Sequence, residues 1–166
     1  IYRRLIHDEH ILDIAEDLIG PCIQLFHDQA LFKPAHHGGP IHWHQDNGYW
    51  KCRPANLVSC WLTLDDVDVA NGAMHLVPGS HLAAHGHERG DVLLDASDAV
   101  GGVEPVVVDL PAGGAMFHHC QTLHSTPPNR TDRQRRAFAA HFMTPGTRSA
   151  TGDMPVSFAR PLLRSR

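Results

Sequence analysis

The spacing of apolar residues changes from a helical period at the front of the chain to a period of two over most of the rest. Residues 9–19 carry apolar side chains every three or four positions and are followed by Gly20-Pro21, which predicts a helix that ends there. Beyond it, short apolar or alternating runs recur between turn-forming residues, as in strands. These runs are 22–26, 29–33, 41–46, 56–64, 74–77, 106–110, 115–118 and 136–143.

Many short strands with turns between them predict a mainly β fold, a β-sandwich or jelly roll, flanked by the N-terminal helix. The sequence shows no internal repeat and no linker, so residues 1–166 are expected to form a single domain. Residues 81–101 are rich in histidine and irregular, which makes them a candidate lid loop. The tail from Thr144 onward is predicted to be loosely ordered.

Composition and charge narrow the class of partner. The hydrophobic fraction is 42% and the charged fraction 19%, as in an ordinary globular protein. A net charge of −4 provides no basic field for nucleic acid or an anionic membrane, so neither is expected as a partner. No apolar run reaches the length of a membrane span, and no signal peptide is recognisable.

The cysteines indicate a reducing compartment. Cys22, Cys52, Cys60 and Cys120 have no C-x-x-C spacing and form no dense framework, so they are expected to be packed thiols in a cytoplasmic protein. The chain begins at Ile1 without a methionine, and a further N-terminal segment is expected to precede it.

Histidine is the unusual component, with 15 residues in 166. Residues i and i+2 of a strand point to the same face, so His44 and Asp46 of a predicted strand can chelate one ion, and His42 shares their face. A third ligand must come from a distant strand. Two histidines and one carboxylate on one face of a metal form the facial triad of non-heme Fe(II) oxygenases.

His124 is our candidate for the third ligand, in competition with His118, His119 and His141. A chain this rich in histidine is expected to contain a His-x-Asp by chance, and the alternative interpretation of His44 and Asp46 is an exposed turn pair.

Arg135 is the candidate anion-binding residue. By a period of two it shares a face with Ala137, Ala139 and His141, and the small alanines leave room for a small anionic ligand. The guanidinium is a rigid bidentate partner for a carboxylate. The alternative is a solvated turn residue, because other arginines surround it.

The combination of these motifs, in order along the chain, resembles the phytanoyl-CoA dioxygenase family. The matching residues are His44-Gln45-Asp46, Trp61, Asn71-Gly72-Ala73-Met74, Pro78-Gly79-Ser80-His81, His124-Ser125-Thr126-Pro127-Pro128-Asn129 and Arg135. Members are Fe(II)- and 2-oxoglutarate-dependent oxygenases on a double-stranded β-helix, a cupin-like jelly roll. The resemblance extends from about Gln29 to Phe142.

The resemblance implies roles for individual residues. His44, Asp46 and His124 take the positions of the iron ligands. Arg135 takes the position of the arginine that binds the distal carboxylate of 2-oxoglutarate, and Thr126 that of a hydroxyl beside it. Three further positions match residues near the co-substrate or substrate, the last two more loosely: Trp61, Lys33 and Gln29. Trp61 could instead be a core aromatic, and Lys33 a surface strand end.

The implied cofactors are Fe(II), 2-oxoglutarate as co-substrate, and O2. The implied reaction hydroxylates an unactivated C–H of a small-molecule or natural-product substrate and releases succinate and CO2. Because Asp46 is present, hydroxylation is favoured over halogenation, whereas desaturation, epimerisation and cyclisation stay open. Tyr49 and Trp50 are candidates for the substrate mouth. Substrate identity and oligomeric state are not readable.

Two other classes of function remain as alternatives. A cupin-like metalloenzyme that does not use 2-oxoglutarate would keep the histidines but would not need Arg135 and Thr126. A non-catalytic, ligand-binding jelly roll would contain the triad only by coincidence.

Overall fold

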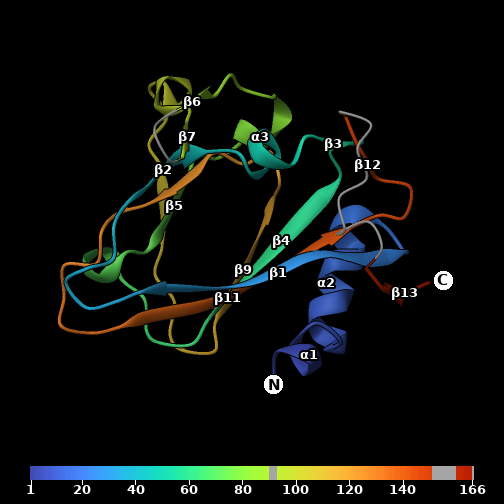
Figure 1. Ribbon diagram of the computed structural model, residues 1–166, viewed down its shortest axis with the longest axis horizontal. Helices are drawn as coiled ribbons and strands as arrows, with labels where there is room; N and C mark the ends of the chain where they lie inside the picture. Colours follow the sequence, from blue (N-terminus) through green and yellow to red (C-terminus); the bar gives the residue numbers. More distant parts are fainter. Residues whose placement is uncertain (90–92, 151–159, 166) are drawn as a thin grey trace.

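Two antiparallel sheets dominate the computed structural model, which describes residues 1–89, 93–150 and 160–165. The five-stranded sheet has the order β13 (Leu162–Arg164), β1 (Ile23–Lys33), β11 (Arg135–Met143), β4 (Leu57–Thr63), β9 (Ala115–His119). The four-stranded sheet has the order β2 (Ile41–His44), β10 (His124–Thr126), β5 (Met74–Leu76), β8 (Val106–Val108). Figure 1 shows the long strands of the first sheet passing beneath the second. The predicted jelly roll is confirmed.

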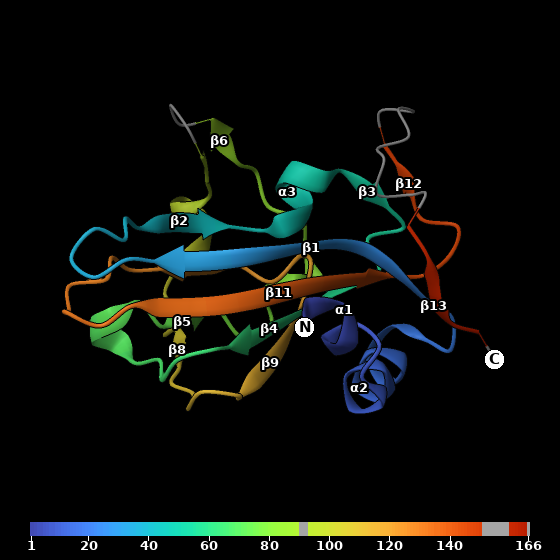
Figure 2. The same cartoon turned by 60° about the horizontal axis from the view of Figure 1, so that its bottom comes forward.

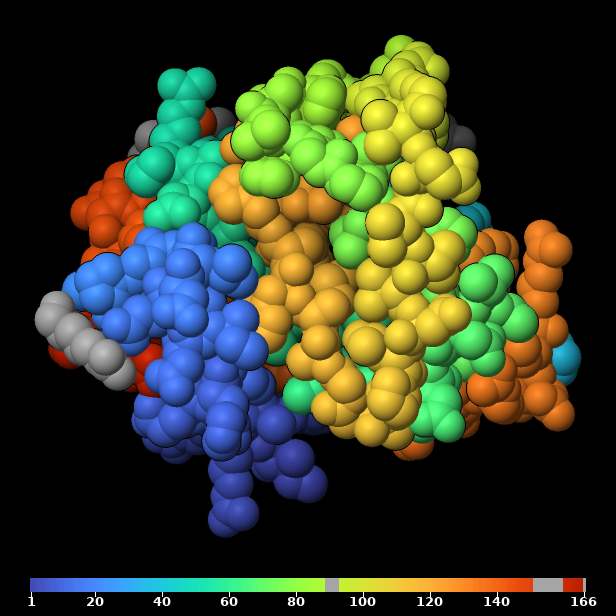
Figure 3. Space-filling model, turned by 180° about the vertical axis from the view of Figure 1, so that it is seen from behind, coloured from blue at the N-terminus to red at the C-terminus, as the bar shows by residue number. Residues whose placement is uncertain are grey.

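The remaining elements are short and lie around these sheets. They are α1 (Tyr2–Leu5), α2 (Glu9–Ile19), α3 (Asp46–Trp50), the pair β3 (Cys52–Arg53) and β12 (Arg148–Ser149), the pair β6 (Glu88–Arg89) and β7 (Leu94–Asp95), and the 3-10 turns η1 (Val69–Asn71), η2 (Ser80–Leu82) and η3 (Ser97–Val100). From behind, residues coloured yellow to amber form the middle of the surface, and the blue N-terminal helices lie to one side (Figure 3).

The helix predicted over residues 9–19 is confirmed as α2. The side chain of Asp8 accepts hydrogen bonds from the backbone N–H groups of His10 and Ile11 and so caps the first turn. The buried face of α2 packs on the outer side of the five-stranded sheet (Figure 2). That core cluster consists of Ile6, Leu12, Ala15, Ile19, Ile23, Leu25, Val58, Cys60, Phe138, Ala140 and Phe142.

The other face of the same sheet turns toward the four-stranded sheet and supplies polar side chains to the interior. Strand register brings His27, His141, Ser59 and His118 into one row across β1, β11, β4 and β9. The next row contains Gln29, Ala139, Trp61 and Met116. Because directly opposed side chains on one face are neighbours, residues far apart in sequence become contacting groups.

The first two predicted strands are a single strand. β1 runs without interruption from Ile23 to Lys33, with a register shift between Leu25 and His27. A bulge of this kind accommodates an extra residue without ending the ladder. The polar pair His27-Asp28 therefore interrupts the hydrophobic pattern but not the strand.

The prediction of a loosely ordered tail was wrong for the described part of it. Residues 148–149 pair with β3, and β13 pairs with β1. The guanidinium of Arg164 contacts three carboxylates on α2, those of Glu9, Asp13 and Glu16, and so joins the C-terminal strand to the first long helix. Residues 151–159 of this tail lie outside the described residues.

Within the described ranges, no helix has the length and apolar character of a membrane span. None of the four cysteines is in a disulfide; Cys52, Cys60 and Cys120 are buried, and Cys22 is half-buried. This agrees with the prediction of packed thiols.

Thiol reactivity should follow this burial. Burial raises the pKa of Cys52 to about 11 and those of Cys60 and Cys120 to about 12, so the reactive thiolate is scarce at neutral pH. We expect Ellman's reagent to modify Cys22 alone in the native protein, and all four cysteines after unfolding in guanidinium. Rapid modification of a second thiol in the native state would contradict this packing.

Candidate active site

Two histidines face each other across neighbouring strands of the four-stranded sheet. His44 at the end of β2 is opposite His124 at the start of β10, with ring centroids 4.2 Å apart. Each ring places Nδ1 beside a backbone carbonyl, at 2.8 Å from His42 O and 2.9 Å from Thr122 O. A carbonyl can only accept, so Nδ1 carries the proton, and the lone pair of each histidine lies on Nε2.

Both Nε2 atoms point toward Asp46. Its Oδ1 lies 3.8 Å from Nε2 of His44 and 3.7 Å from Nε2 of His124. One ligand atom from each of the three residues can be chosen so that all lie within 4.8 Å of one another. The three residues therefore form a compact donor set at one point.

The predicted route to this geometry was wrong in one respect. β2 ends at His44 and Asp46 is the first residue of α3, although Gln45 between them has an extended backbone, with φ −106° and ψ 133°. His42, expected on the ligand face, is exposed and lies near Asp95. The extended backbone of Gln45 keeps the carboxylate on the side of His44, as the i and i+2 spacing predicts, whereas a register shift between β2 and β10 turns His42 away.

The charge states suit a divalent metal. Burial alone would raise the pKa of Asp46, but the imidazoles of His124 and His118, with a hydrogen bond from the latter, hold that pKa well below its usual range. Burial, with the charge of His44, lowers the pKa of His124 to about 3. An ionised carboxylate and neutral imidazole nitrogens are ligands for Fe(II), and the residues present therefore fit this ion.

A cavity of about 310 Å³ extends from this donor set between the two sheets and has Arg135 at its other end. Arg135 is only 3% exposed, and its guanidinium carbon lies 5.5 Å from the centroid of the Trp61 ring. Burial lowers the pKa of Arg135 to about 10, so the group stays charged at neutral pH.

Two buried polar atoms at this end have no hydrogen-bond partner in the described part of the chain: Nε of Arg135 and Oγ1 of Thr126. Both residues line the cavity. Buried polar groups are almost always paired, and leaving them unpaired is unfavourable by about 1–3 kcal/mol each. An anion with carboxylate oxygens would satisfy both.

The structure separates the two looser sequence candidates on β1. Gln29 lines the cavity, and its amide nitrogen lies 3.3 Å from Nε2 of His141. Lys33 is absent from the residues that line the described cavity and donates to the carbonyl of Gly39. Its side chain packs on Gly72, which has φ +100°, and a Cβ there would lie 2.8 Å from Cδ of Lys33. That close approach explains the glycine of the Asn71-Gly72 motif.

Gln45, between the two ligand positions, carries a structural role that the sequence did not reveal. It is 2% exposed, and its amide donates to the carbonyls of Ala83 and Gln121 and accepts from the N–H of His85. The backbone N–H of Gln45 also donates to Nε2 of His87. Gln45 thus binds the first part of the candidate lid, residues 81–101, to the metal-ligand loop.

Two further contacts were also not readable from the sequence. The hydroxyl of Tyr49 accepts from the N–H of Leu94, which attaches a second point of the 81–101 segment to α3. The amide of buried Asn129 donates to the carbonyls of Lys33, Pro34 and Arg133, and so supports the turn before Arg135. Both depend on partners more than 40 residues away along the chain, or on loop geometry, which local patterns do not encode.

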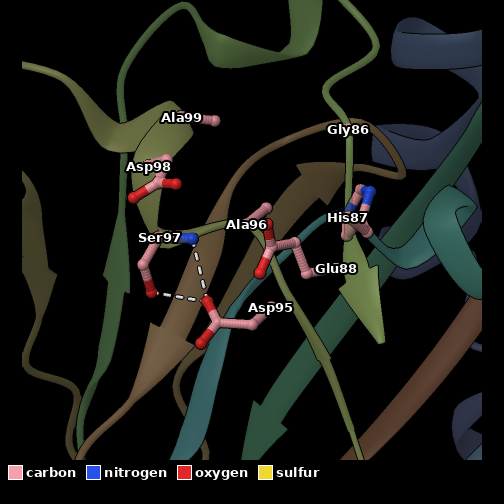
Figure 4. A pocket seen from close by; sticks show the side chains of 8 residues that line it. All are labelled: Gly86, His87, Glu88, Asp95, Ala96, Ser97, Asp98 and Ala99. Carbon is pink, nitrogen blue, oxygen red and sulfur yellow. Dashed lines mark hydrogen bonds between the residues drawn. The ribbon is translucent and has the colours of Figure 1, made fainter. Parts of the chain in front are cut away.

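A second cavity, of about 530 Å³, lies between residues 86–88 and residues 95–99 and has different chemistry (Figure 4). Its lining includes Glu88, Asp95 and Asp98, and Asp95 accepts hydrogen bonds from the N–H and hydroxyl of Ser97. An acidic lining of this kind repels a dicarboxylate, so this cavity does not compete with that of Arg135 for 2-oxoglutarate.

A jelly roll with a His-x-Asp turn facing a histidine on the adjacent strand defines the class of cupin-like, non-heme iron proteins. Within that class, the sequence model of the phytanoyl-CoA dioxygenase (PhyH) family matches residues 2–137. The chain belongs to this family, and the predicted resemblance is confirmed.

Individual relatives agree with this assignment. A probable alpha-ketoglutarate-dependent hypophosphite dioxygenase of Stutzerimonas stutzeri is 30% identical over 80% of this chain and 49% of its own length. The bovine (Bos taurus) phytanoyl-CoA dioxygenase domain-containing protein 1 is 28% identical over 86% of this chain and 53% of its own. The chain therefore spans about half the length of these curated relatives.

Solved structures share the fold over nearly the whole chain. The epimerase SnoN in complex with Fe3+, alpha-ketoglutarate and nogalamycin RO superposes with a TM-score of 0.82, at 30% identity over 98% of this chain and 73% of SnoN. The apo non-heme monooxygenase ThoJ gives a TM-score of 0.81, at 32% identity over 99% of this chain and 61% of ThoJ.

The role of Gln45 generates a stability prediction. Gln45→Leu removes three hydrogen bonds, to the carbonyls of Ala83 and Gln121 and from the N–H of His85, so we expect the free energy of unfolding to fall by about 3 kcal/mol. Amide hydrogen exchange in the 81–88 segment should accelerate at the same time. Gln134→Leu, at an exposed position, is the matched control and should change neither quantity. Equal effects of both substitutions would show that Gln45 does not bind the 81–88 segment to the metal-ligand loop.

Proposed function

We propose that this protein is an Fe(II)- and 2-oxoglutarate-dependent oxygenase that hydroxylates an unactivated C–H bond of a small molecule or natural product. The observation that carries the proposal is one cavity with a three-residue metal donor set at one end and a buried, partly unpaired arginine at the other. The family assignment supports the same chemistry. We propose that residues 1–166 belong to a single oxygenase domain.

His44, Asp46 and His124 are the proposed iron ligands. They would hold the ion from one side, and the remaining positions would be available to the co-substrate and dioxygen. The hydrogen bonds from Nδ1 of both histidines hold their rings with Nε2 directed at the ion, so no rearrangement is needed on binding.

Arg135 and Thr126 are the proposed partners of the distal carboxylate of 2-oxoglutarate. The arginine supplies charge and the threonine hydroxyl one further donor, and both atoms that lack partners become satisfied. Trp61 packs against the guanidinium and restricts its orientation. A cupin-like enzyme that does not use 2-oxoglutarate offers no reason for a buried cation there.

The bound iron would supply activation of dioxygen, coupled to conversion of 2-oxoglutarate into succinate and CO2 and to oxidation of the substrate. The chain's own contribution is to position the reactants and to exclude water from a site in which His124 and Arg135 are each no more than 5% exposed. Tyr49 and Trp50 line the cavity and are the proposed contacts with substrate, together with Gln29; for Lys33 we propose a role through the charge that it places near Arg135.

The substrate class is proposed as a small molecule. Relatives are named for hypophosphite and ectoine, and SnoN was solved with nogalamycin RO, which covers a broad range of chemistry. We also propose a cytoplasmic location, on the ground that none of the four cysteines is in a disulfide.

An anaerobic titration with Fe(II) and 2-oxoglutarate tests the proposal. Iron chelated by the 1-carboxylate and 2-keto oxygen gives a visible charge-transfer band. We expect the band only when both components are present, at one equivalent of each, and no band in His124→Ala. A folded protein without the band would favour a metalloenzyme of another type or a ligand-binding jelly roll.

Arg135 should act on the co-substrate and not on the metal. For Arg135→Ala we expect the affinity for 2-oxoglutarate to fall roughly a hundredfold, as for the loss of a buried charge-assisted pair, whereas Fe(II) affinity stays within about threefold. Calorimetric titration measures both.

Arg136→Ala is the matched control for this substitution, since its neighbouring guanidinium is exposed and bound to Asp65. It should leave both affinities unchanged. If Arg135→Ala weakened iron and 2-oxoglutarate equally, Arg135 would be a structural residue.

A further inference from the structure

The two carboxylate oxygens of Asp46 have different surroundings. Oδ1 faces Nε2 of His44 and of His124, at 3.8 and 3.7 Å. Oδ2 is turned away from these two atoms and lies 3.1 Å from the hydroxyl of Ser59 and 3.3 Å from Nε2 of His118. One oxygen is directed at the metal position, and the other is hydrogen-bonded to the protein.

The hydrogen bond from Ser59 to Asp46 is the last in a series of hydrogen bonds that begins at Gln29. A carboxylate oxygen accepts, so the hydroxyl of Ser59 donates to Oδ2. The hydroxyl oxygen of Ser59 also lies 2.7 Å from Nδ1 of His141. Because the hydroxyl hydrogen is directed at Asp46, Nδ1 of His141 is the donor in this second bond. Nε2 of His141 is left as an acceptor, and the amide nitrogen of Gln29 lies 3.3 Å from it.

Each hydrogen bond in this series can be donated in only one direction. Burial lowers the pKa of His141 to about 4, so the ring is neutral and carries a single N–H. Donation from Gln29 to Nε2 places that hydrogen on Nδ1. The hydroxyl of Ser59 is thereby prevented from donating to His141 and remains directed at Asp46.

The sheet builds this arrangement from strand register. His141 is opposite Ser59, and Ser59 is opposite His118. The register of three neighbouring strands therefore places both donors to Asp46, Ser59 and His118, beside one carboxylate. All three residues are buried, with Ser59 at 0% exposed. Trp50 packs against the edge of the His141 ring, at 4.9 Å between centroids, and limits its rotation.

We propose that Ser59, His118 and the pair His141 and Gln29 are positioning residues that hold Asp46 in monodentate coordination. An untethered carboxylate can bind a metal through both oxygens and would then occupy a fourth position. Three open positions are required when a co-substrate takes two and dioxygen one. The inference rests on the proposed function, because it concerns the same metal site.

Mn(II) alone, added to the full chain, is the probe. Water proton relaxation counts the water molecules on bound Mn(II), and the spectrum of free Mn(II) gives the affinity. The wild-type protein should bind one Mn(II) with about three waters. In Ser59→Ala and in His118→Phe the water count should fall by about one third, because Oδ2 becomes a ligand, and the affinity should change by about tenfold.

His119→Phe is the matched control. It removes an imidazole from the next position of β9, one that accepts a hydrogen bond from the N–H of Gln121. Wild-type water count and affinity are expected. Gln29→Leu changes an exposed position, so it keeps the fold, and it should shift the water count in the same direction as Ser59→Ala. Should His118→Phe fail to fold by circular dichroism, Ser59→Ala and Gln29→Leu decide the question.

The outcomes separate the two claims. If the wild-type protein binds no Mn(II), the proposed function fails and the inference with it. If the wild type binds one Mn(II) but Ser59→Ala and Gln29→Leu keep its water count and affinity, the positioning role is wrong and the proposed function stands. An equal fall in His119→Phe would indicate general loosening of β9 and would also overturn the positioning role.

Discussion

The structure depends on a largely enclosed negative charge, the carboxylate of Asp46, whose side chain is 14% exposed. An ionised group in a protein interior is strongly unfavourable unless it is hydrogen-bonded and paired. Here the compensation comes from many parts of the chain, with histidines on β2 and β10, Ser59 on β4 and His118 on β9. A divalent cation at Oδ1 would complete the compensation of this charge. The protein therefore orients the carboxylate before the metal binds.

A second electrostatic imbalance lies at the other end of the cavity. Lys33 and Arg135 are opposite one another on β1 and β11, and like charges in this position are unfavourable. Burial, with the charge of Arg135, lowers the pKa of Lys33 to about 8. The cavity thus has a cationic end and a metal-binding end. A divalent cation would relieve the imbalance at Asp46, and one carboxylate of a small dicarboxylate bound to that cation would relieve the imbalance at Arg135.

Much of the fold was predictable because it follows from local periodicity. The helix at residues 9–19 and the alternation from Arg135 to His141 were read correctly from the spacing of apolar residues. His124 was a correct candidate for the cluster that the structure displays. The helix that begins at Asp46 was not predicted, because a five-residue helix of mixed polarity leaves no periodic signal.

The contacts that surround the site could not be predicted from the sequence, for a different reason. His118 and His141 were considered only as competing ligands, and their contacts with Asp46 and Ser59 follow from the register of β11, β4 and β9. Register is a property of paired strands, and no single strand specifies it. The same holds for Gln45, whose amide partners lie 38 and 76 residues away.

A crystal structure of the protein grown anaerobically with Fe(II) and 2-oxoglutarate tests the central claim most directly. Anomalous scattering at the iron edge should show one ion, bonded at about 2 Å to Nε2 of His44, Nε2 of His124 and Oδ1 of Asp46. The far carboxylate of 2-oxoglutarate should lie on Arg135 and Thr126. Iron bound elsewhere, or 2-oxoglutarate away from Arg135, would contradict the account.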